Sequence, residues 1–363
     1  MKEGTFFLNS LEEVLSCWKQ YDWEVKLKKV LNKKVKLVDE KIECLKNTRE
    51  KTSIWKLILT DGREFIPIVL KIYKQPLKEN HRLEINMYQK AYNIYQEFMP
   101  KLYWLEPNVN GEETWMFTEC LQPLRGQIKL APKHLEQIIP TVAKFHAITY
   151  DKRFLQHADL FDSSLPYFDS EEKVKERTKG IKKAKENLER AMKDPNLTEL
   201  IAPRYKIIKK ILKKGPVFFP EITESGQCLI HGDLHVHNIC CENARDVENW
   251  KITLIDWESA KHYPCWYDLV VLVELLIDFR SDWQQSEEEI RRNCVQVYCE
   301  EMLKYGITFN EDPLNLLKKA YLQRTLEKKL SSHLQKVLGG GKSTLLKRYL
   351  EKIEVWGKEL GLY

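Results

Sequence analysis

The 363-residue chain contains the stretch His231-Gly232-Asp233-Leu234-His235-Val236-His237-Asn238. Apolar runs at 227–230 and 239–241 flank it, so the pattern predicts a loop between two short strands. An aspartate and an asparagine five residues apart on such a loop can have two separate roles in a reaction. Asp233 can accept or orient a hydroxyl proton, and the amide oxygen of Asn238 is a hard ligand for Mg²⁺.

A second acidic motif, Ile255-Asp256-Trp257-Glu258, begins where an apolar strand ends, and its aspartate stands 18 residues after Asn238. The carboxylate of Asp256 can supply a further contact to Mg²⁺. Phosphoryl transfer needs little beyond positioned charge, because its transition state spreads negative charge over the phosphoryl oxygens. The two motifs together therefore predict this chemistry.

One lysine, Lys71, stands within the apolar strand Ile68–Tyr73. A lysine there is costly unless it meets an anion. Glu84 follows 13 residues later on the next predicted helix, and a Lys–Glu pair whose lysine also touches nucleotide phosphates is the kinase arrangement. The alternatives are a strand lysine that reaches solvent and an exposed helical glutamate.

The hydrophobic periodicity divides the chain into two parts. Short β-like runs with one inserted helix occupy residues 1–121, and helices predominate in residues 122–363. We therefore predict an α+β fold with a small antiparallel sheet in the N-terminal lobe and a larger, mainly α-helical C-terminal lobe. The predicted strands are 35–45, 54–59, 65–73, 101–105, 114–119, 227–230, 239–241 and 250–255. Asp61-Gly62, between the second and third of them, predicts a tight hairpin turn. The predicted helices are 11–21, 80–98, 135–149, 171–193, 197–214, 269–279, 286–305, 312–337 and 342–359.

Together these motifs resemble the aminoglycoside phosphotransferase/choline kinase-like family. The resemblance rests on 231–238 followed by 255–258, with Lys71 and Glu84 upstream. It implies the bilobal protein-kinase-like fold and an ATP- and Mg²⁺-dependent kinase that phosphorylates a hydroxyl of a small molecule. Residues 1–121 would then be the nucleotide-binding lobe and 122–363 the catalytic and substrate-binding lobe.

The resemblance also implies a role for each residue of the motifs. Asp233 would be the catalytic base or the group that orients the acceptor hydroxyl. Asn238 and Asp256 would hold Mg²⁺. Lys71 would bind the α- and β-phosphates of ATP, and Glu84 would position Lys71.

Three further segments resemble parts of the same family. Met116–Leu121 resembles the strand and hinge that contact adenine through backbone groups, which places Glu119 and Cys120 at the nucleotide. Asp268, in Tyr267-Asp268-Leu269, resembles a buried aspartate that begins a helix and braces the catalytic loop. Ala143–Ala147 resembles a helix whose histidine is structural.

One segment departs from the family pattern. The loop that should cover the phosphates, Lys46–Thr52, contains no glycine. This departure leaves open an alternative function, a structural protein of the spore-coat type in which the kinase fold has weak or no catalysis, although the intact set of Asp233, Asn238 and Asp256 argues against a loss of catalysis. A nucleotide-binding titration separates the two hypotheses.

The net charge of +6 is local in origin. The segment 171–215 contains 15 Lys/Arg against 7 Asp/Glu, a net charge of +8, which leaves −2 for the rest of the chain. A solvated helical insertion accounts for this segment, and an anion or nucleic-acid patch is the alternative. No aromatic stacking ladder accompanies the lysines, so we do not expect nucleic acid as a partner.

Two sequence features imitate other sites. His231, His235 and His237 suggest zinc, but no Cys/His cluster at zinc-finger spacing follows them. Gly339–Thr344 resembles the end of a P-loop, yet Lys336 stands where that motif requires glycine. For the second feature we expect a break between two helices, with Ser343 as a possible N-cap.

The sequence says little about the acceptor. Acidic groups at 287–289 or 300–301 could bind a cationic acceptor, but acidic surface helices are usually only solvated. Choline-like, sugar-like, amino-alcohol and antibiotic acceptors all stay open, as does the oligomeric state. The absence of a long apolar stretch and of a signal-like N-terminus, with nine cysteines in no disulfide-like spacing, predicts a cytoplasmic protein without a membrane partner.

Overall fold

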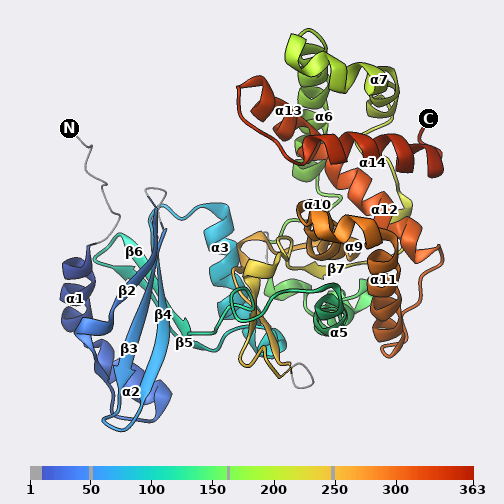
Figure 1. Ribbon diagram of the computed structural model, residues 1–363. Coiled ribbons are helices and arrows are strands. Elements are labelled where there is room, and N and C mark those ends of the chain that lie inside the picture. The colour runs from blue at the N-terminus through green and yellow to red at the C-terminus, as the bar shows by residue number, and fades with distance from the viewer. Residues whose placement is uncertain (1–9, 49–51, 162–163, 247–249) are drawn as a thin grey trace, which may run out of the picture. The chain divides into compact units, whose positions relative to one another are not determined.

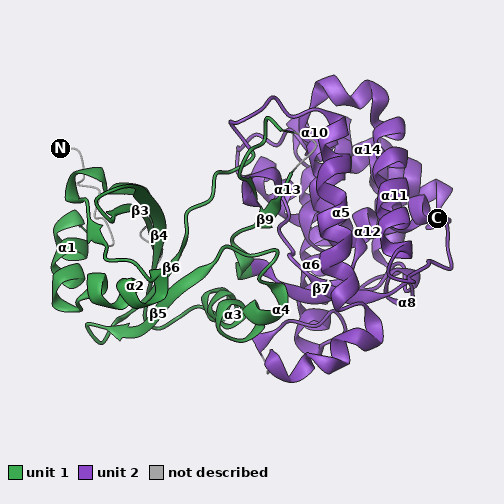
Figure 2. Ribbon diagram, turned by 90° about the horizontal axis from the view of Figure 1, so that it is seen from below, with its two compact units in different colours: residues 1–124, 240–258 green, residues 125–239, 259–363 purple. Residues whose placement is uncertain are grey.

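The computed structural model describes residues 10–48, 52–161, 164–246 and 250–363. The chain forms two compact units, 1–124 with 240–258 and 125–239 with 259–363 (Figure 2). The division of the sequence at residue 121 stays a prediction. In the structure, residues 240–258 group with the N-terminal unit although they lie far along the chain.

The first unit is built on a six-stranded antiparallel sheet in the order β1-β3-β4-β6-β5, with β2 also paired to β3 (Figure 1). Its strands are β1 (Lys36–Leu37), β2 (Glu43–Thr48), β3 (Thr52–Thr60), β4 (Phe65–Lys74), β5 (Leu102–Val109) and β6 (Glu113–Glu119). Its helices are α1 (Leu11–Gln20), α2 (Trp23–Leu31), α3 (Glu79–Asn86) and α4 (Tyr92–Tyr95), with a π-helical turn at Met87–Ala91.

Two differences from the predicted elements occur in this unit. The single strand expected at 35–45 is interrupted by a 3₁₀ turn at Asp39–Lys41, which separates β1 from β2. The helix α2 was not predicted; it starts after Asp22, whose left-handed backbone (φ 49°) breaks the chain direction at the end of α1. The hairpin expected at Asp61-Gly62 joins β3 to β4, with Gly62 at φ 88°.

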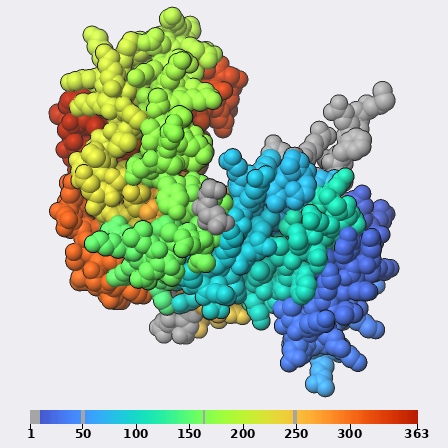
Figure 3. All heavy atoms as spheres, turned by 180° about the vertical axis from the view of Figure 1, so that it is seen from behind, coloured from blue at the N-terminus to red at the C-terminus, as the bar shows by residue number. Residues whose placement is uncertain are grey.

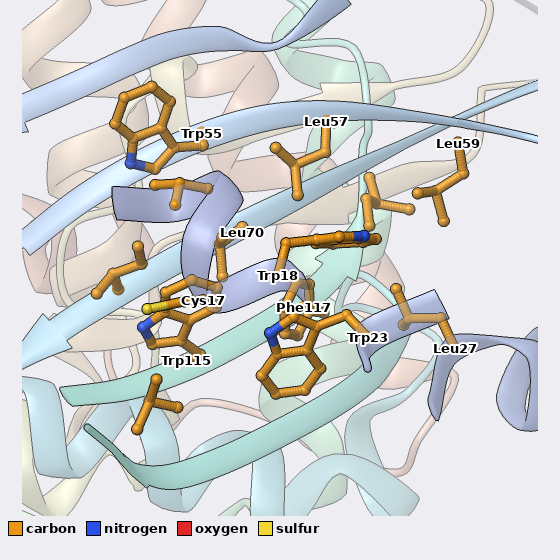
Figure 4. Packing of buried hydrophobic residues seen from close by; sticks show 14 of the residues in the cluster. Cys17, Trp18, Trp23, Leu27, Trp55, Leu57, Leu59, Leu70, Trp115 and Phe117 are labelled. Carbon is orange, nitrogen blue, oxygen red and sulfur yellow. The ribbon is translucent and has the colours of Figure 1, made fainter. Parts of the chain in front are cut away.

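A cluster of aromatic side chains fixes α1 and α2 to the sheet (Figure 4). Trp23 stacks on Trp115 with 5.8 Å between ring centroids, and it lies 4.6 Å from the ring of Phe117. Trp18 meets the same phenylalanine edge-on at 6.1 Å. Aromatic pairs of this kind combine a large buried area with a preferred geometry. This face of the sheet is therefore a packed core, and the opposite side chains of β4 are left for other contacts.

A short strand pair from later in the chain completes the first unit. β8 (Ile239–Cys241) pairs with β9 (Ile252–Leu254). The backbone N–H of Cys241 donates to the carbonyl of Gln122 at 3.1 Å, and that of Leu254 donates to the carbonyl of Phe98 at 2.7 Å. These bonds carry the segment after β9 toward α3 and β4.

The second unit is mainly helical and contains one two-stranded antiparallel sheet. Its strands are β7 (Gln227–Ile230) and β10 (Lys261–Pro264). Its helices are α5 (Pro132–Ile148), α6 (Glu171–Met192), α7 (Pro195–Leu212), α8 (Glu221–Glu224), α9 (Trp266–Leu269), α10 (Leu275–Phe279), α11 (Glu287–Leu303), α12 (Pro313–Arg324), α13 (Leu330–Leu338) and α14 (Leu346–Glu359). π-helical turns at Val270–Glu274 (η9) and Thr325–Lys329 (η11) join α9 to α10 and α12 to α13. The predicted α+β class is confirmed.

The basic segment 171–215 forms α6 and α7, whose yellow-green atoms cover the upper part of Figure 3. The apolar stripe of α6, which includes Ile181 and Leu188, is buried, while most of its lysines are exposed. Gly180 lets α6 approach η11 closely, because a Cβ at this position would lie 2.0 Å from the carbonyl oxygen of Glu327. The segment is thus an integral helical layer of the second unit.

A buried ion network ties three helical segments of the second unit together. Glu274 accepts from Arg291 Nε at 2.5 Å and from Lys352 Nζ at 2.8 Å. Lys352 also donates to Asp278 at 2.7 Å. Burial opposes the charged form of Glu274, but Lys352 and Arg291 outweigh it and lower its pKa to about 2. The carboxylate is therefore ionised throughout the neutral range.

The P-loop-like stretch is a helix break, as expected. α13 ends at Leu338 and α14 begins at Leu346, and Ser343 Oγ accepts from the backbone N–H of Leu346 at 3.2 Å. All nine cysteines are free thiols. Among the described residues, no helix is both long enough and apolar enough to cross a membrane.

Candidate active site

Lys71, Glu84 and Asp256 come together in the first unit, although Asp256 is 185 residues from Lys71 in the sequence. Lys71 Nζ donates to Glu84 Oε2 at 2.6 Å and to Asp256 Oδ1 at 2.9 Å. Lys71 is 9% exposed and Glu84 is 2% exposed. The two alternatives left open by the sequence, that Lys71 reaches solvent and that Glu84 is an exposed helical residue, are therefore wrong.

The strand alternation explains why Lys71 is available for this contact. Leu70 and Ile72 point into the aromatic core, so Lys71 points to the opposite face of β4. α3 follows β4 directly and presents Glu84 to the lysine. The hydroxyl of Tyr73, two residues along the same strand, donates to Glu84 Oε2 at 2.9 Å and fixes the carboxylate.

The charges of Lys71, Glu84 and Asp256 shift one another's pKa values. Burial alone would lower the pKa of Lys71, but the carboxylates of Glu84 and Asp256 outweigh it and the pKa is raised. Burial raises the pKa of Glu84, and the charge of Asp256 adds to this effect while Lys71 opposes it. Lys71 is thus firmly cationic, and two carboxylates compete for it.

Asp256 adopts a left-handed backbone conformation, with φ 66°. This conformation costs a non-glycine residue about 1 kcal/mol or more. The indole of Trp257, which is fully buried, donates to the carbonyl of Leu254 at 2.9 Å and holds the turn at the end of β9. Packing of the neighbouring residue therefore maintains the strained backbone that aims Asp256 at Lys71.

Glu258 also belongs to this group, although the sequence reasoning assigned it no role. Its Oε2 accepts from Asn80 Nδ2 at 2.8 Å. One carboxylate oxygen from each of Glu84, Asp256 and Glu258 lies within 4.8 Å of the others. The available signal was its place two residues after Asp256 in the same short motif.

The hinge residues lie on the strand next to Lys71. β6 pairs with β4, with Met116 opposite Lys71 and Glu119 opposite Ile68. The backbone N–H of Glu119 donates to the carbonyl of Lys101 at 2.9 Å, and its side chain accepts from the N–H of the same lysine at 3.2 Å. Cys120 follows the strand, and partial burial raises the pKa of its thiol.

The loop His231–Asn238 lies in the second unit, where Asp268 braces it. Asp268 Oδ2 accepts from the backbone N–H of His231 at 2.7 Å, and Oδ1 accepts from that of Gly232 at 2.8 Å. Asp268 is fully buried within α9, and His146 Nε2 lies 3.2 Å from it. Burial raises the pKa of Asp268, but the bond and charge of His146 help to outweigh it and leave the pKa lowered. The brace expected from the resemblance is confirmed.

Gly232 is required at its place in the loop. Its φ is +80°, and a Cβ would lie 2.1 Å from the carbonyl oxygen of Ser259. Only a residue without a side chain permits this approach of two backbone segments. The next residue, Asp233, follows this turn, and its side chain is 48% exposed.

Asn238 is the buried end of the same loop. Its Nδ2 donates to the carbonyl oxygen of Asp233 at 2.9 Å, which fixes the orientation of the amide. Since the nitrogen is used in this bond, the amide oxygen is the group left to bind a cation. His235 Nε2 lies 3.5 Å from Asp233 Oδ2.

The histidines of the loop do not form a zinc site. His231 Nδ1 accepts from the N–H of Asp233 at 3.4 Å, and the ring of His237 contacts Arg125. Within the described ranges, the one set of three acidic, histidine or cysteine side chains close enough to share a metal is the one at Lys71, which contains no histidine.

The predicted site residues thus form two groups. Lys71, Glu84 and Asp256 meet in the first unit, with Glu119 and Cys120 on the adjoining strand, and Asp233 and Asn238 share the loop of the second unit. The donor set of the first group suits a hard divalent cation, because Asp256 and Glu258 offer carboxylate oxygens. Lys71 adds a fixed positive charge suited to phosphate oxygens.

Part of the phosphate-covering loop lies outside the described residues. The glycine-free segment Lys46–Thr52 includes residues 49–51, which the structure does not describe. On either side of them, β2 runs to Thr48 and pairs with β3 from Thr52 onward. The expectation about this loop stays a prediction.

Comparisons with known proteins bear on the family and the fold of the chain. The profile of a family described as the phosphotransferase enzyme family matches residues 53–304. A spectinomycin phosphotransferase solved with ADP and spectinomycin is similar in fold, with a TM-score of 0.50, 14% identity and 88% of each chain covered. A Plasmodium vivax ethanolamine kinase (TM-score 0.49, 15% identity, 87% of this chain and 82% of that chain) and a Brachybacterium faecium macrolide 2'-phosphotransferase (0.48, 12%, 92% and 98%) also match. No curated protein matches significantly.

Proposed function

The chain belongs to the phosphotransferase enzyme family, and from this premise we propose that it is a kinase that transfers the γ-phosphoryl group of ATP to a hydroxyl of a small molecule, with Mg²⁺ as cofactor. The observation that carries the proposal is the contact of Lys71 with both Glu84 and Asp256. A nearly buried cation held between two carboxylates from distant parts of the chain is the arrangement that phosphoryl transfer uses to place phosphates and metal.

In this proposal the first unit binds the nucleotide. Lys71 binds the α- and β-phosphates, and Glu84 holds the lysine in place through the 2.6 Å ion pair. The backbone around Glu119 and Cys120, on the strand beside Lys71, contacts the adenine. ADP bound to the structurally similar spectinomycin phosphotransferase supports ATP as the donor.

Asp256 and Asn238 would hold Mg²⁺, which neutralises charge on the phosphates when bound. Glu258 is a further carboxylate within reach of Asp256. Each of these side chains is held within its own unit, Asp256 by the left-handed turn and Asn238 by its bond to the loop backbone. Fixed ligands require little reorganisation when charge develops during the reaction.

Asp233 orients the acceptor hydroxyl and takes its proton. As the hydroxyl oxygen bonds to the γ-phosphorus, the bond from phosphorus to the β,γ-bridging oxygen breaks and ADP leaves. The proton passes to the carboxylate of Asp233, which partial exposure leaves accessible to an acceptor. Asp268 holds the loop that presents it.

An ATP-consumption screen tests the proposal. Purified protein with Mg-ATP is assayed for ADP formation against cationic, neutral and anionic hydroxyl compounds, with EDTA as the control for metal dependence. We expect one class of acceptor to raise ADP formation well above the rate without acceptor, and EDTA to abolish the increase. Nucleotide binding without turnover on any acceptor would instead favour the structural, spore-coat-type alternative.

A further inference from the structure

Positive charge gathers in one helical segment of the second unit. The segment from Arg324 to Lys336 contains four Lys/Arg and one acid, Glu327. Its first half is the π-helical turn η11, which shifts the helical register between α12 and α13. Turns of this kind are frequent at functional sites.

Lys329, the last residue of η11, is half-buried. Burial lowers its pKa to about 8, helped by the charges of Arg324 and Lys328, while Asp233 is the acid that acts against this shift. In the described part of the chain, Lys329 forms no ion pair. Lys329 is therefore an electrostatic neighbour of the catalytic aspartate with no acid of its own.

Lys261 approaches the loop from β10. A Cβ at Gly232, the residue before Asp233, would lie 3.1 Å from Lys261 Cε. Its Nζ lies 4.6 Å from the ring centroid of Tyr263, and no described carboxylate pairs with it. Burial, then the charge of Arg324, lowers its pKa to about 8. Two partly desolvated lysines thus adjoin the catalytic loop.

Glu327 does not neutralise this set of cations. Its charge is shared among Arg177, Lys261 and Arg324, and Gln323 donates to its Oε2 at 3.1 Å. Burial raises its own pKa, and these cations act against that rise. Desolvated cations without matching acids are costly unless an anion joins them.

Three of the five acids that could have bound a cationic acceptor are engaged in local ion pairs. Glu287 pairs with Arg348, and Glu288 pairs with Arg291 Nη1 at 2.8 Å. Glu301 pairs with Lys304 at 2.5 Å. These three acids are therefore already neutralised by neighbouring cations.

We propose that the acceptor carries a negatively charged group, a phosphate or a carboxylate, which binds to Lys261 and Lys329 beside Asp233. The inference rests on the proposed function and names the charge class of its acceptor. Arg324 and Lys328 make the electrostatic potential at this site more positive, but the proposal does not require them to contact the acceptor directly. Both lysines and the loop belong to one compact unit, so the site is complete within it.

Calorimetric titration tests the inference without turnover. The probes are ribose 5-phosphate and glycerate (anionic), ribose and glycerol (neutral), and ethanolamine and kanamycin (cationic). We expect at least one anionic probe to bind more tightly than its neutral counterpart. Lys329→Gln and Lys261→Gln should each weaken this binding at least tenfold, whereas Lys329→Arg should retain it within threefold. Lys206→Gln, at an exposed position of α7, is the matched control and should change nothing.

Binding of the cationic probes in preference to the anionic ones, no binding of either anionic probe, or anion binding that survives both glutamine substitutions overturns the inference. The ADP assay on the same compounds separates this result from the proposed function. Turnover with a cationic acceptor would support the kinase and contradict the anion site. Anion binding lost in Lys329→Gln, without ADP formation on any compound, would support the site and contradict the kinase. Circular dichroism of each variant checks that it is folded.

Discussion

Lys71 Nζ lies 2.6 Å from Glu84 Oε2, and the same ammonium group lies 2.9 Å from Asp256 Oδ1. One cation therefore links the sheet, the helix α3 and the turn after β9 in the first unit. Glu84 is buried with Tyr73 as its other hydrogen-bond donor, so its charge depends on the lysine. The pair is both a structural element and the proposed phosphate site.

Lys71→Met tests both roles. Removing the cation leaves the Glu84 carboxylate buried with Asp256 nearby, and breaking such a buried pair costs about 3–5 kcal/mol. We expect the free energy of unfolding in urea to fall by this order, and titration with a fluorescent ATP analogue to show affinity reduced at least tenfold. Lys74→Met, on the same strand, is the control. Unchanged nucleotide affinity in a folded Lys71→Met protein would contradict the phosphate-binding role.

Gly232→Ala tests the close approach of the catalytic loop to Ser259. Alanine must adopt φ +80° and place its Cβ 2.1 Å from a carbonyl oxygen, so the loop must move. Gly126→Ala is a matched control, because Gly126 has φ +93° with no atom within 4 Å of its Cβ position. Both variants incur backbone strain of about 1–3 kcal/mol. We expect turnover to be lost only in Gly232→Ala. Similar activity in the two variants would show that the approach is unimportant.

Glu274 gives stability a specific dependence on pH. Its pKa is about 2 in the folded protein against a usual value of 4.5. Its contribution of about 3 kcal/mol is therefore fully present above pH 4.5 and is lost as the pH falls toward 2. Urea unfolding of wild type and Glu274→Gln between pH 6 and pH 3 should show a difference that shrinks on acidification. Glu172→Gln, at an exposed site, should follow wild type; a constant difference for Glu274→Gln would contradict the lowered pKa.

Local patterns predicted the elements that position the site. The alternation of β4 and the turn at Asp61-Gly62 gave the hairpin, and the isolated Lys71 and the loop 231–238 gave most of the candidate residues. The helix α2 was not predicted, because Asp22 changes the chain direction through a left-handed backbone conformation that hydrophobic periodicity does not encode. The strand β10 was not predicted either, because its four residues end in Pro264 and show no clear alternation of apolar and polar side chains.

Two candidate functional residues, Glu258 and Lys329, could be identified only from the three-dimensional structure. Glu258 stands in a motif that was recognised, but its approach to Asp256 depends on the left-handed turn. Lys329 lies in a long helical pattern that is typical of a solvated surface. The charge of Asp233 acts on the pKa of Lys329 although the two residues are far apart in the sequence, which sequence spacing does not reveal.

The most direct test of the central claim is the initial rate of ADP formation by wild type and Asp233→Asn, with Mg-ATP and the acceptor that performs best in the screen. Asparagine keeps the shape of the side chain but cannot take the hydroxyl proton, so we expect the rate to fall by a factor of about 10²–10⁴. Unfolding free energy and ATP affinity should stay close to wild type, and Asp159→Asn, at an exposed site, should keep full activity. A folded Asp233→Asn protein with the wild-type rate would contradict the assignment of Asp233 as the catalytic residue.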